Sequence, residues 1–344
     1  MQCRHCAVNM DIPWSQTLSC NAPQAPYKRG TTNVMHYGQL KLLLSEIQFL
    51  NHVGNWHGSV LIYAGASPGL HIPTLLRLHP GLRLVLVDPQ PNIMRNSARV
   101  RVIRAYLTDD LAYALACQYG ENILFVSDIR IGGGRNESDD EQQARIHRDM
   151  VAQMNWHRIM SPRASLMKFR LPWTVPFTDY LSGIIYLPVY GKKLTHEARL
   201  LVFRGAPVIR YDNKLYEGQM AYFNQFIRRN TYPGGQCFDC YTLRQLVGEE
   251  HGRQIMWELE RESVRWLRRR RQCKPKSTCQ IESFKGRKGS PSRPRRWDCS
   301  PWISSFKRAA HRRGGDLNYA CRQPNYCCGW MGGGEGVWWT LFRR

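Results

Sequence analysis

The chain of 344 residues contains no long hydrophobic run and comparatively few acidic residues. No apolar stretch approaches the length of about 18 residues that a membrane-spanning helix needs, and Met1 to Met10 lack the apolar core of a secretion signal. We therefore expect a protein that is neither membrane-spanning nor secreted. In a reducing compartment its 12 cysteines are expected to be thiols or metal ligands rather than disulfides. No internal repeat is apparent, so a repeat architecture is not expected.

The shortage of acidic residues gives the chain a strong positive charge. Against 26 Asp and Glu stand 49 Lys and Arg, a formal net charge of +23. Residues 261–344 hold 21 basic and five acidic side chains, which leaves a balance of only +7 for residues 1–260. An excess of this sign favours phosphate polymers or anionic surfaces as partners over cationic ones.

Composition divides the chain into three parts. Residues 1–33 are rich in Pro, Asn, Thr and Ser without periodicity, which predicts an irregular N-terminal arm. Residues 34–271 carry periodic apolar patterns and are predicted to form one globular domain. Residues 272–344 are rich in Lys, Arg, Gly, Pro and Ser, which predicts a basic, disordered tail. The composition of this tail suits sequence-independent RNA binding, and a nuclear import signal or a solvated tail without a role are the alternatives.

The globular part alternates between buried strands and amphipathic helices. Its strands read as almost entirely apolar, which is typical of a mostly parallel sheet covered by helices on both faces. We predict seven strands, at 59–65, 82–87, 100–103, 122–126, 166–169, 184–187 and 198–203. Helices are predicted near 40–50, 71–78, 111–117, 141–159 and 217–229, followed by a last amphipathic segment that reaches residue 271. The fold class is therefore α/β, doubly wound.

A glycine-rich turn follows the first predicted strand, at Gly65 and Gly69, and the second strand ends in Asp88. Glycines allow a tight turn and a close approach of a ligand, and an acidic side chain about 20 residues on can accept both ribose hydroxyls of an adenosine. A nucleoside cofactor is thus predicted at the carboxyl ends of the strands. The alternative is that the glycines only shape a connection.

The turn lacks the patterns of two common nucleotide sites. Its glycines do not form G-x-G-x-x-G, and no Lys-Ser or Lys-Thr follows them, so neither a dinucleotide fingerprint nor a P-loop is present. A proline before the second glycine is found in S-adenosylmethionine (SAM) sites.

Five segments resemble, in order, those of the poxvirus-type mRNA cap 2′-O-methyltransferase, which is also the small regulatory subunit of poly(A) polymerase. They are YGQLKLLL (37–44), ASPGLH (66–71), VSDIR (126–130), LMKFRLP (166–172) and HEARLL (196–201). The resemblance covers about residues 36–247. It implies a Rossmann-like SAM-dependent methyltransferase acting on the first transcribed nucleotide of capped mRNA. It also implies a poly(A) polymerase catalytic subunit as partner, and a viral source with a soluble protein in the virion and host cytoplasm.

By this resemblance the catalytic residues are Lys41, Asp128, Lys168 and Glu197. A ribose 2′-hydroxyl must lose its proton as it attacks, and a lysine serves as base only if burial or another cation lowers its pKa. Lys168 would be that base and Lys41 the second cation, with Asp128 and Glu197 orienting them. Taken singly, each of these residues could be merely solvated. The main alternative function is a catalytically inactive RNA-binding subunit of the polymerase; a nicotinamide enzyme is remote.

The same resemblance implies the ligand-binding residues. For SAM they are Gln39, Gly65, Ala66, Pro68, Gly69, His71, Asp88, Ala105, Tyr106 and Asp128. For the cap, a methylated guanine is favoured between two aromatic faces with a carboxylate at its edge. Trp173 is one predicted wall, Glu217 the edge acid, and Tyr27 or Trp14 the second wall. The family's second acid falls near Val175, and Asp179 would replace it only if the loop shifts.

The cysteines raise the alternative of a zinc site. Cys3 and Cys6 form one C-x-x-C pair, and Cys237 and Cys240 form another. The two pairs lie 231 residues apart, no His-x-x-His accompanies them, and the related family has no metal. We therefore predict no metal site.

Overall fold

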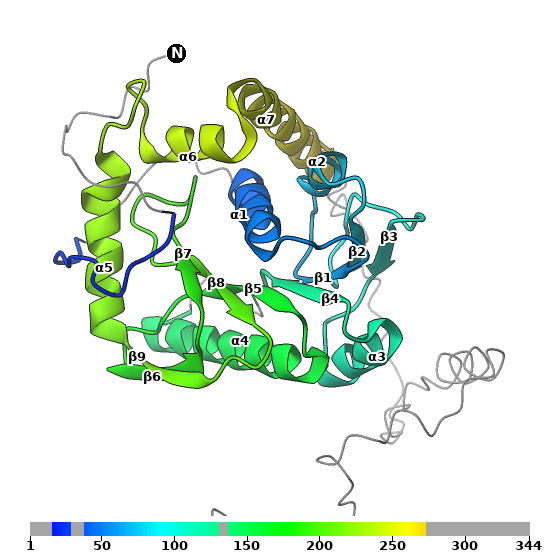
Figure 1. Ribbon diagram of the computed structural model, residues 1–344, viewed down its shortest axis with the longest axis horizontal. Coiled ribbons are helices and arrows are strands. Elements are labelled where there is room, and N and C mark those ends of the chain that lie inside the picture. The colour runs from blue at the N-terminus through cyan, green and yellow to red at the C-terminus, as the bar shows by residue number, and fades with distance from the viewer. Residues whose placement is uncertain (1–15, 29–37, 131–136, 273–344) are drawn as a thin grey trace, which may run out of the picture. The chain divides into compact units, whose positions relative to one another are not determined.

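The computed structural model describes residues 16–28, 38–130 and 137–272, with side chains to Arg268. Its central feature is a seven-stranded sheet in the order β3-β2-β1-β4-β5-β8-β7 (Figure 1). Strands β1 to β5 pair in parallel, β8 runs antiparallel to β5, and β7 runs antiparallel to β8. The bounds are β1 Val60–Ala64, β2 Arg83–Val87, β3 Val100–Ile103, β4 Ile123–Ser127, β5 Ala164–Phe169, β7 Ile184–Tyr186 and β8 Ala198–Phe203.

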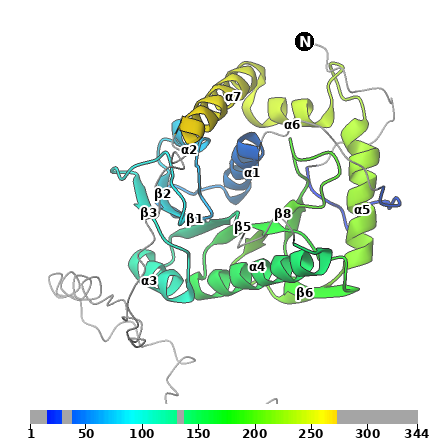
Figure 2. The same cartoon turned by 180° about the vertical axis from the view of Figure 1, so that it is seen from behind.

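Helices cover both faces of this sheet. Figure 1 and Figure 2 show α1, α2, α6 and α7 on one face and α3 and α4 on the other. The bounds are α1 Gly38–Val53, α2 Ile72–Leu78, α3 Asp109–Tyr119, α4 Asp139–Met160, α6 Phe238–Val247 and α7 Glu249–Gln272. The predicted doubly wound, mostly parallel seven-stranded architecture is therefore confirmed. No helix within the described ranges combines the length and apolarity that a membrane crossing requires.

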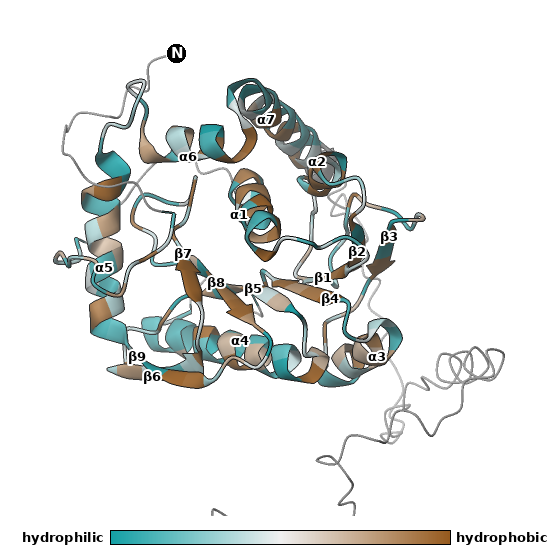
Figure 3. Ribbon diagram, in the orientation of Figure 1, coloured by the Kyte–Doolittle hydropathy of each residue, from teal (hydrophilic) through white to brown (hydrophobic). Residues whose placement is uncertain are grey.

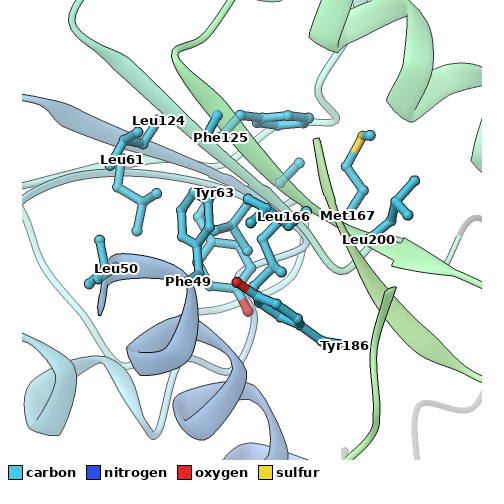
Figure 4. Close-up of a cluster of buried hydrophobic side chains, with 14 of the residues drawn as sticks. Phe49, Leu50, Leu61, Tyr63, Leu124, Phe125, Leu166, Met167, Tyr186 and Leu200 are labelled. Carbon is cyan, nitrogen blue, oxygen red and sulfur yellow. The ribbon is translucent and has the colours of Figure 1, made fainter. Parts of the chain in front are cut away.

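The core lies on both faces of the central sheet. Figure 4 shows Phe49 and Leu50 of α1 beside the face of the sheet that carries Tyr63 and Leu166. Tyr63 of β1 lies on the α1 face and Phe125 of β4 and Met167 of β5 lie on the opposite face; all three are essentially inaccessible to solvent. Colouring by hydropathy shows brown strands at the centre and helices with mixed faces (Figure 3), as expected for a sheet buried on both sides.

Three details differ from the sequence-based expectation. A separate two-stranded sheet, formed by β6 (Phe177–Leu181) and β9 (Val208–Asp212), was not expected. Helix α5 spans Asn213–Gln225, beginning four residues earlier than predicted, because the Asp212 carboxylate caps it by accepting from the Leu215 N–H. The last amphipathic segment is two helices, separated at Gly248 with φ of +79°.

The N-terminal segment 16–28 lies along the sheet edge and α5. It forms an isolated bridge between Thr17 and Tyr186 of β7, and the Leu18 N–H donates to the Ile185 carbonyl at 2.8 Å. This part of the predicted arm contains no helix or regular strand. The remaining arm residues and, of the predicted tail 272–344, all residues after Gln272 lie outside the described residues, so the predicted domain limits stay predictions.

Candidate functional site

The turn after β1 is built on two glycines. Gly65 has φ of +79°, and a Cβ there would lie 2.8 Å from the Asp128 carbonyl carbon and oxygen. Gly69 has φ of +72°, and its Cβ would lie 2.6 Å from the Asn92 amide oxygen. Asn92 in turn donates to the Ala66 carbonyl at 2.8 Å. Only glycine fits both positions, so the turn is held open and close to the backbone that follows β4.

Asp88 closes the other side of this turn. Its Oδ2 accepts from the Ser67 N–H at 2.9 Å, and its Oδ1 accepts from the Gln90 N–H at 2.7 Å. Each carboxylate oxygen retains acceptor capacity after these bonds. Ala105 and the exposed Tyr106 follow β3, the next strand of the sheet. The arrangement leaves an acceptor pair where a ribose is expected in this kind of fold.

Two predicted cofactor residues form a network behind the turn. His71 is 1% exposed; its Nδ1 lies 2.9 Å from Gln39 Oε1, and its Nε2 lies 3.0 Å from Glu46 Oε1. Gln39 Oε1 also accepts from the Leu70 N–H at 2.9 Å. These contacts tie α1 to the start of α2. His71 therefore supports the turn from the interior.

The four predicted catalytic residues lie in one connected cluster. Lys168 Nζ lies 2.8 Å from Asp128 Oδ1, and Lys41 Nζ lies 2.6 Å from Glu197 Oε1. Arg199 joins the two pairs, with Nη2 2.7 Å from Asp128 Oδ1 and Nη1 3.6 Å from Glu197 Oε1. Lys168 also donates to the carbonyls of Asp128 and Ile129.

Four separate elements supply this cluster. Asp128 follows β4, Lys168 lies near the end of β5, and Lys41 is in the first turn of α1. Glu197 and Arg199 lie at the start of β8, which meets the end of β5 because the two strands are antiparallel; Lys168 and Arg199 are register partners. The cluster therefore occupies the carboxyl edge of the parallel strands, beside the glycine turn.

The charges of the cluster stabilise one another. Burial alone would raise the pKa of Asp128, but Lys168, Arg199 and Lys41 outweigh it and lower that pKa. The pKa of Glu197 is held well below its ordinary value in the same way. The pKa of the Lys41 ammonium is lowered, chiefly because the group is buried and to a smaller extent because Arg199 lies nearby. The cluster thus holds the side chains of two lysines and one arginine against two carboxylates.

Two supporting residues were not singled out from the sequence. Arg199 is 5% exposed, donates a hydrogen bond to Asp128 and forms a longer ion pair with Glu197. It lies two residues after Glu197, and the alternation of an extended chain places such residues on one face. Gln153 of α4 accepts from the Lys168 N–H and donates to the Lys168 carbonyl, both at 3.1 Å. Gln153 gives no sequence signal, because its role depends on packing of α4 against β5.

A second cluster of side chains lies next to the first. The Arg170 guanidinium sits 4.8 Å from the centre of the Trp173 ring, and the Tyr27 ring lies 4.6 Å from the His196 ring. Burial and then Arg170 lower the pKa of His196 to about 4, so this imidazole is neutral at neutral pH. Trp173 and Tyr27 are each 39% exposed. Two accessible aromatic rings thus flank one polar cluster.

The predicted edge acids differ in their surroundings. Glu217 on α5 is half-buried, and within the described ranges its carboxylate makes no hydrogen bond or ion pair. Asp179 lies on β6 and forms a two-pronged ion pair with Arg210, its register partner on β9, at 2.9 and 3.2 Å. Asp179 is therefore engaged on the small sheet, and Val175 supplies no acid in its place. Trp14 lies outside the described residues.

Two cavities meet at Glu197. An open cleft of about 370 Å³ reaches Lys168 along α4 and is lined by Arg130, Arg145, Ile146, Asp149, Met150, Gln153, Lys168, Arg170 and Glu197. A second, narrow pocket adjoins the Lys41–Glu197 pair from the side of α1 and β7. Arg130 spans the first cleft's mouth to Glu197 Oε2 at 2.7 Å. The cleft therefore combines three guanidinium groups with access to the catalytic cluster.

The cysteines yield no metal site in the described ranges. Cys237 and Cys240 lie at the start of α6, and the Tyr190 hydroxyl donates to Cys240 Sγ at 3.5 Å. No group of three or more metal-ligating side chains was found among the described residues. Cys3 and Cys6 lie outside them.

Comparison with known proteins identifies the family. The family model described as "Poly A polymerase regulatory subunit" matches residues 21–240, which is more than half of the chain. The chain belongs to this family. The match includes Tyr27 and the whole cluster of Lys41, Asp128, Lys168 and Glu197 and ends inside α6, so α7 lies beyond it.

Two viral proteins are among the relatives of this chain. Both are named cap-specific mRNA (nucleoside-2'-O-)-methyltransferase. That of Myxoma virus (strain Lausanne) is 29% identical over 220 residues, covering 56% of this chain and 62% of the relative. That of Fowlpox virus (strain NVSL) is 27% identical over 226 residues, covering 58% and 71%. The chain thus spans less than two thirds of the Myxoma virus protein.

Solved structures with some likeness are more distant. The bluetongue virus capping protein VP4 matches 62% of this chain and 33% of its own at 13% identity, with a TM-score of 0.42. A putative ribosomal RNA methyltransferase of Plasmodium falciparum matches 47% of this chain and 95% of its own at 12% identity, with a TM-score of 0.32.

Proposed function

We propose that this chain is a SAM-dependent methyltransferase that modifies the ribose 2′-hydroxyl of the first transcribed nucleotide of capped mRNA. The observation that carries the proposal is the hydrogen-bonded cluster of Lys41, Asp128, Lys168 and Glu197. Four separate elements bring these groups together beside a glycine turn, at the edge of the sheet where such folds bind ligands. The names of the poxvirus relatives support the same activity.

In this mechanism Lys168 is the base. SAM, when bound, supplies an electrophilic methyl group. The Lys168 amine accepts the 2′-hydroxyl proton as the oxygen attacks, and Asp128, 2.8 Å away, orients that amine. Lys41 and Arg199 place two further positive charges in the same cluster. Glu197 fixes Lys41 and keeps it from turning into the cleft.

The residues of the turn fit a SAM molecule. Asp88 offers its remaining lone pairs to the two ribose hydroxyls, and Tyr106 offers an exposed ring to the adenine. Gly65, Ala66, Pro68 and Gly69 form the backbone that would hold the methionine portion. Gln39 and His71 hold this turn from behind. The fit depends on the absence of side chains at the two glycines.

Gly65→Ala is expected to weaken cofactor binding strongly. The new Cβ would lie 2.8 Å from the Asp128 carbonyl at a positive φ, so the turn must shift, at a cost of about 1–3 kcal/mol for the strain alone. We expect affinity for S-adenosylhomocysteine, measured by calorimetry, to fall at least tenfold. Gly120→Ala is the control, because Gly120 also has a positive φ but a Cβ there would have no atom within 4 Å. Equal affinity in the wild type and Gly65→Ala would contradict this account of the turn.

Trp173 and Tyr27 are proposed as the walls of the cap site, and Glu217 as the acid at the guanine edge. A methylated guanine is a cation with a large flat face, so it is favoured by aromatic rings and a carboxylate. The Arg170 guanidinium, itself a planar cation, lies 4.8 Å from the centre of the Trp173 ring, so this ring already contacts a group of the same kind.

Replacing the Trp173 wall is expected to reduce cap affinity. Stacking on one aromatic ring contributes about 1–3 kcal/mol, so Trp173→Ala should raise the Kd for 7-methylguanosine triphosphate about 10- to 100-fold. Trp257→Ala is a matched control, because Trp257 is also exposed and lies 4.3 Å beneath the guanidinium of Arg261. Fluorescence titration measures the affinity of each variant for the cap analogue. Equal losses of affinity in the two variants would show that Trp173 is not part of the cap site.

The open cleft along α4 is proposed as the path of the RNA that follows the cap. Arg130, Arg145 and Arg170 line it and can contact phosphates, with Arg130 also paired with Glu197 and Arg145 with Glu137. Methyl transfer to short capped and uncapped RNAs tests the function directly. We expect transfer to the 2′-oxygen of the capped RNA only. RNA binding without transfer would favour the catalytically inactive subunit instead.

The family membership also supports a partner and a location. We propose that the chain associates with the catalytic subunit of a poly(A) polymerase and acts in the virion and the host cytoplasm. Co-purification of the two co-expressed subunits tests the association.

A further inference from the structure

Helix α5 carries three buried side-chain amides, on Asn213, Gln219 and Asn224, which are 4%, 5% and 3% exposed. Each donates hydrogen bonds to backbone carbonyls of a different segment outside the helix. We propose that these amides are positioning residues that fix three walls of the nucleotide site: the Trp173 loop, the Tyr27 segment and the Glu197 loop. The inference rests on the proposed function, since it assigns the amides to that site.

Asn213 holds the loop that carries Trp173. Its Nδ2 lies 2.8 Å from the Pro172 carbonyl and 2.9 Å from the Val175 carbonyl, so it binds on both sides of Trp173. The same nitrogen lies 2.9 Å from Thr178 Oγ1, and the Asn213 N–H donates to the Pro176 carbonyl. Glu217 follows one helical turn later. Asn213 therefore sets the spacing between the proposed wall and the proposed edge acid.

Gln219 holds the segment that carries Tyr27. Its Nε2 lies 3.0 Å from the Cys20 carbonyl and 3.2 Å from the Ala22 carbonyl. Further contacts extend along the segment: the Ala25 N–H donates to the Gly218 carbonyl, and Gln225 Nε2 donates to the Pro26 carbonyl, one residue before Tyr27. A Cβ at position 218 would lie 2.9 Å from the Gln24 amide oxygen, so the segment approaches α5 closely.

Asn224 holds the loop that precedes β8. Its Nδ2 donates to the Thr195 carbonyl at 2.9 Å, and Thr195 Oγ1 accepts from the Glu197 N–H at 3.0 Å. Tyr216, also on α5, donates from its hydroxyl to the His196 carbonyl at 2.6 Å. The helix therefore fixes the backbone on both sides of His196 and aligns Glu197 toward Lys41.

Packing alone does not account for these amides. A buried amide N–H loses its hydration and needs an acceptor in the protein, whereas an apolar side chain would fill the same space without that requirement. Asn213 and Asn224 are 11 residues apart and share a helix face, whereas Gln219 faces elsewhere. One helix thus reaches three segments that are far apart in sequence, and each of the three carries a residue of the proposed site.

The variants Asn213→Ala, Gln219→Ala and Asn224→Ala test the inference, because each removes the same kind of donor from the same helix. Amide hydrogen exchange of the full chain should rise locally, in 172–178, 19–26 and 193–197 respectively. Provided that the wild type binds the cap, Asn213→Ala and Gln219→Ala should raise the Kd for 7-methylguanosine triphosphate about tenfold relative to the wild type. Both variants should leave kcat at saturating RNA unchanged. Asn224→Ala should lower kcat about tenfold and leave that Kd unchanged. Affinity for S-adenosylhomocysteine should stay constant in all three.

The crossed pattern distinguishes positioning from general destabilisation. Equal changes in exchange across all three segments, or the same kinetic change in every variant, would overturn the inference. If Asn213→Ala does not fold, Asn213→Ser retains one donor and should show an intermediate Kd and intermediate local exchange. A wild type that binds no cap would refute the proposed function, while the local exchange pattern would still decide whether the amides position these segments.

Discussion

Replacing Lys168 by alanine is expected to reduce the rate of methyl transfer to capped RNA by about 10²- to 10⁴-fold, the range typical of a lost general base. The side chain reaches the cluster from the end of β5, and its amine lies 2.8 Å from Asp128. No other amine in the described cluster occupies this position, because Lys41 is bound to Glu197 at 2.6 Å. Single-turnover transfer of a labelled methyl group measures the effect.

The controls for Lys168→Ala separate chemistry from binding. Affinities for S-adenosylhomocysteine and for 7-methylguanosine triphosphate should remain within a factor of about two of the wild type, because the glycine turn and the aromatic rings are untouched. Lys192→Ala, at an exposed lysine of the loop before β8, should leave the rate unchanged. If Lys168→Ala retained transfer and Lys41→Ala lost it, the base would be Lys41, whose pKa burial lowers.

Arg199→Met is expected to cause the largest loss of stability of any single change in the site. The guanidinium is buried and bonds Asp128 at 2.7 Å, with Glu197 at 3.6 Å. Removing one partner of a buried ionic network leaves uncompensated charge and costs about 3–5 kcal/mol of unfolding free energy. Urea denaturation measures it. Arg204→Met, which removes an exposed arginine just beyond β8, should cost less than about 1 kcal/mol.

The stability difference between the wild type and Arg199→Met should depend on pH. In the folded wild type the pKa values of Asp128 and Glu197 are depressed, with Arg199 among the causes. Depressed carboxylates contribute stability that is complete above their unfolded pKa values, near about 4, and is lost as the pH falls through the folded values. The difference should therefore be largest at neutral pH and shrink below about pH 4. A difference that grew on acidification would contradict the proposed network.

The fold could be predicted because the signals that determine it are local. Apolar strands alternate with amphipathic helices, and all seven strands of the main sheet were expected near their observed positions. The β6–β9 sheet was missed because its strands pair across about 30 residues of chain. Each strand also mixes polar with apolar positions: Phe177–Leu181 contains Thr178 and Asp179, and Val208–Asp212 contains Arg210. Such short segments carry little signal without their partners.

The candidate site was predictable to a smaller degree. The order of five segments indicated Lys41, Asp128, Lys168 and Glu197, and their roles stay predictions. The sequence could not show that Tyr27 approaches His196, because that contact depends on the 16–28 segment lying against α5, about 200 residues later. Nor could it show that Arg210 engages Asp179, which depends on the unexpected pairing of β6 with β9.

The reversed direction of β8 has a consequence for how this site is encoded. In a sheet of parallel strands only strand ends reach the ligand-binding edge, so each strand contributes residues from its last positions. At β8 the side chains come from the beginning of the strand instead: Glu197 directly precedes it and Arg199 is its second residue. Were it parallel, these two side chains would lie at the opposite rim, about 20 Å away for a strand of six residues. One change of chain direction thus decides whether the two lysines meet their counter-charges.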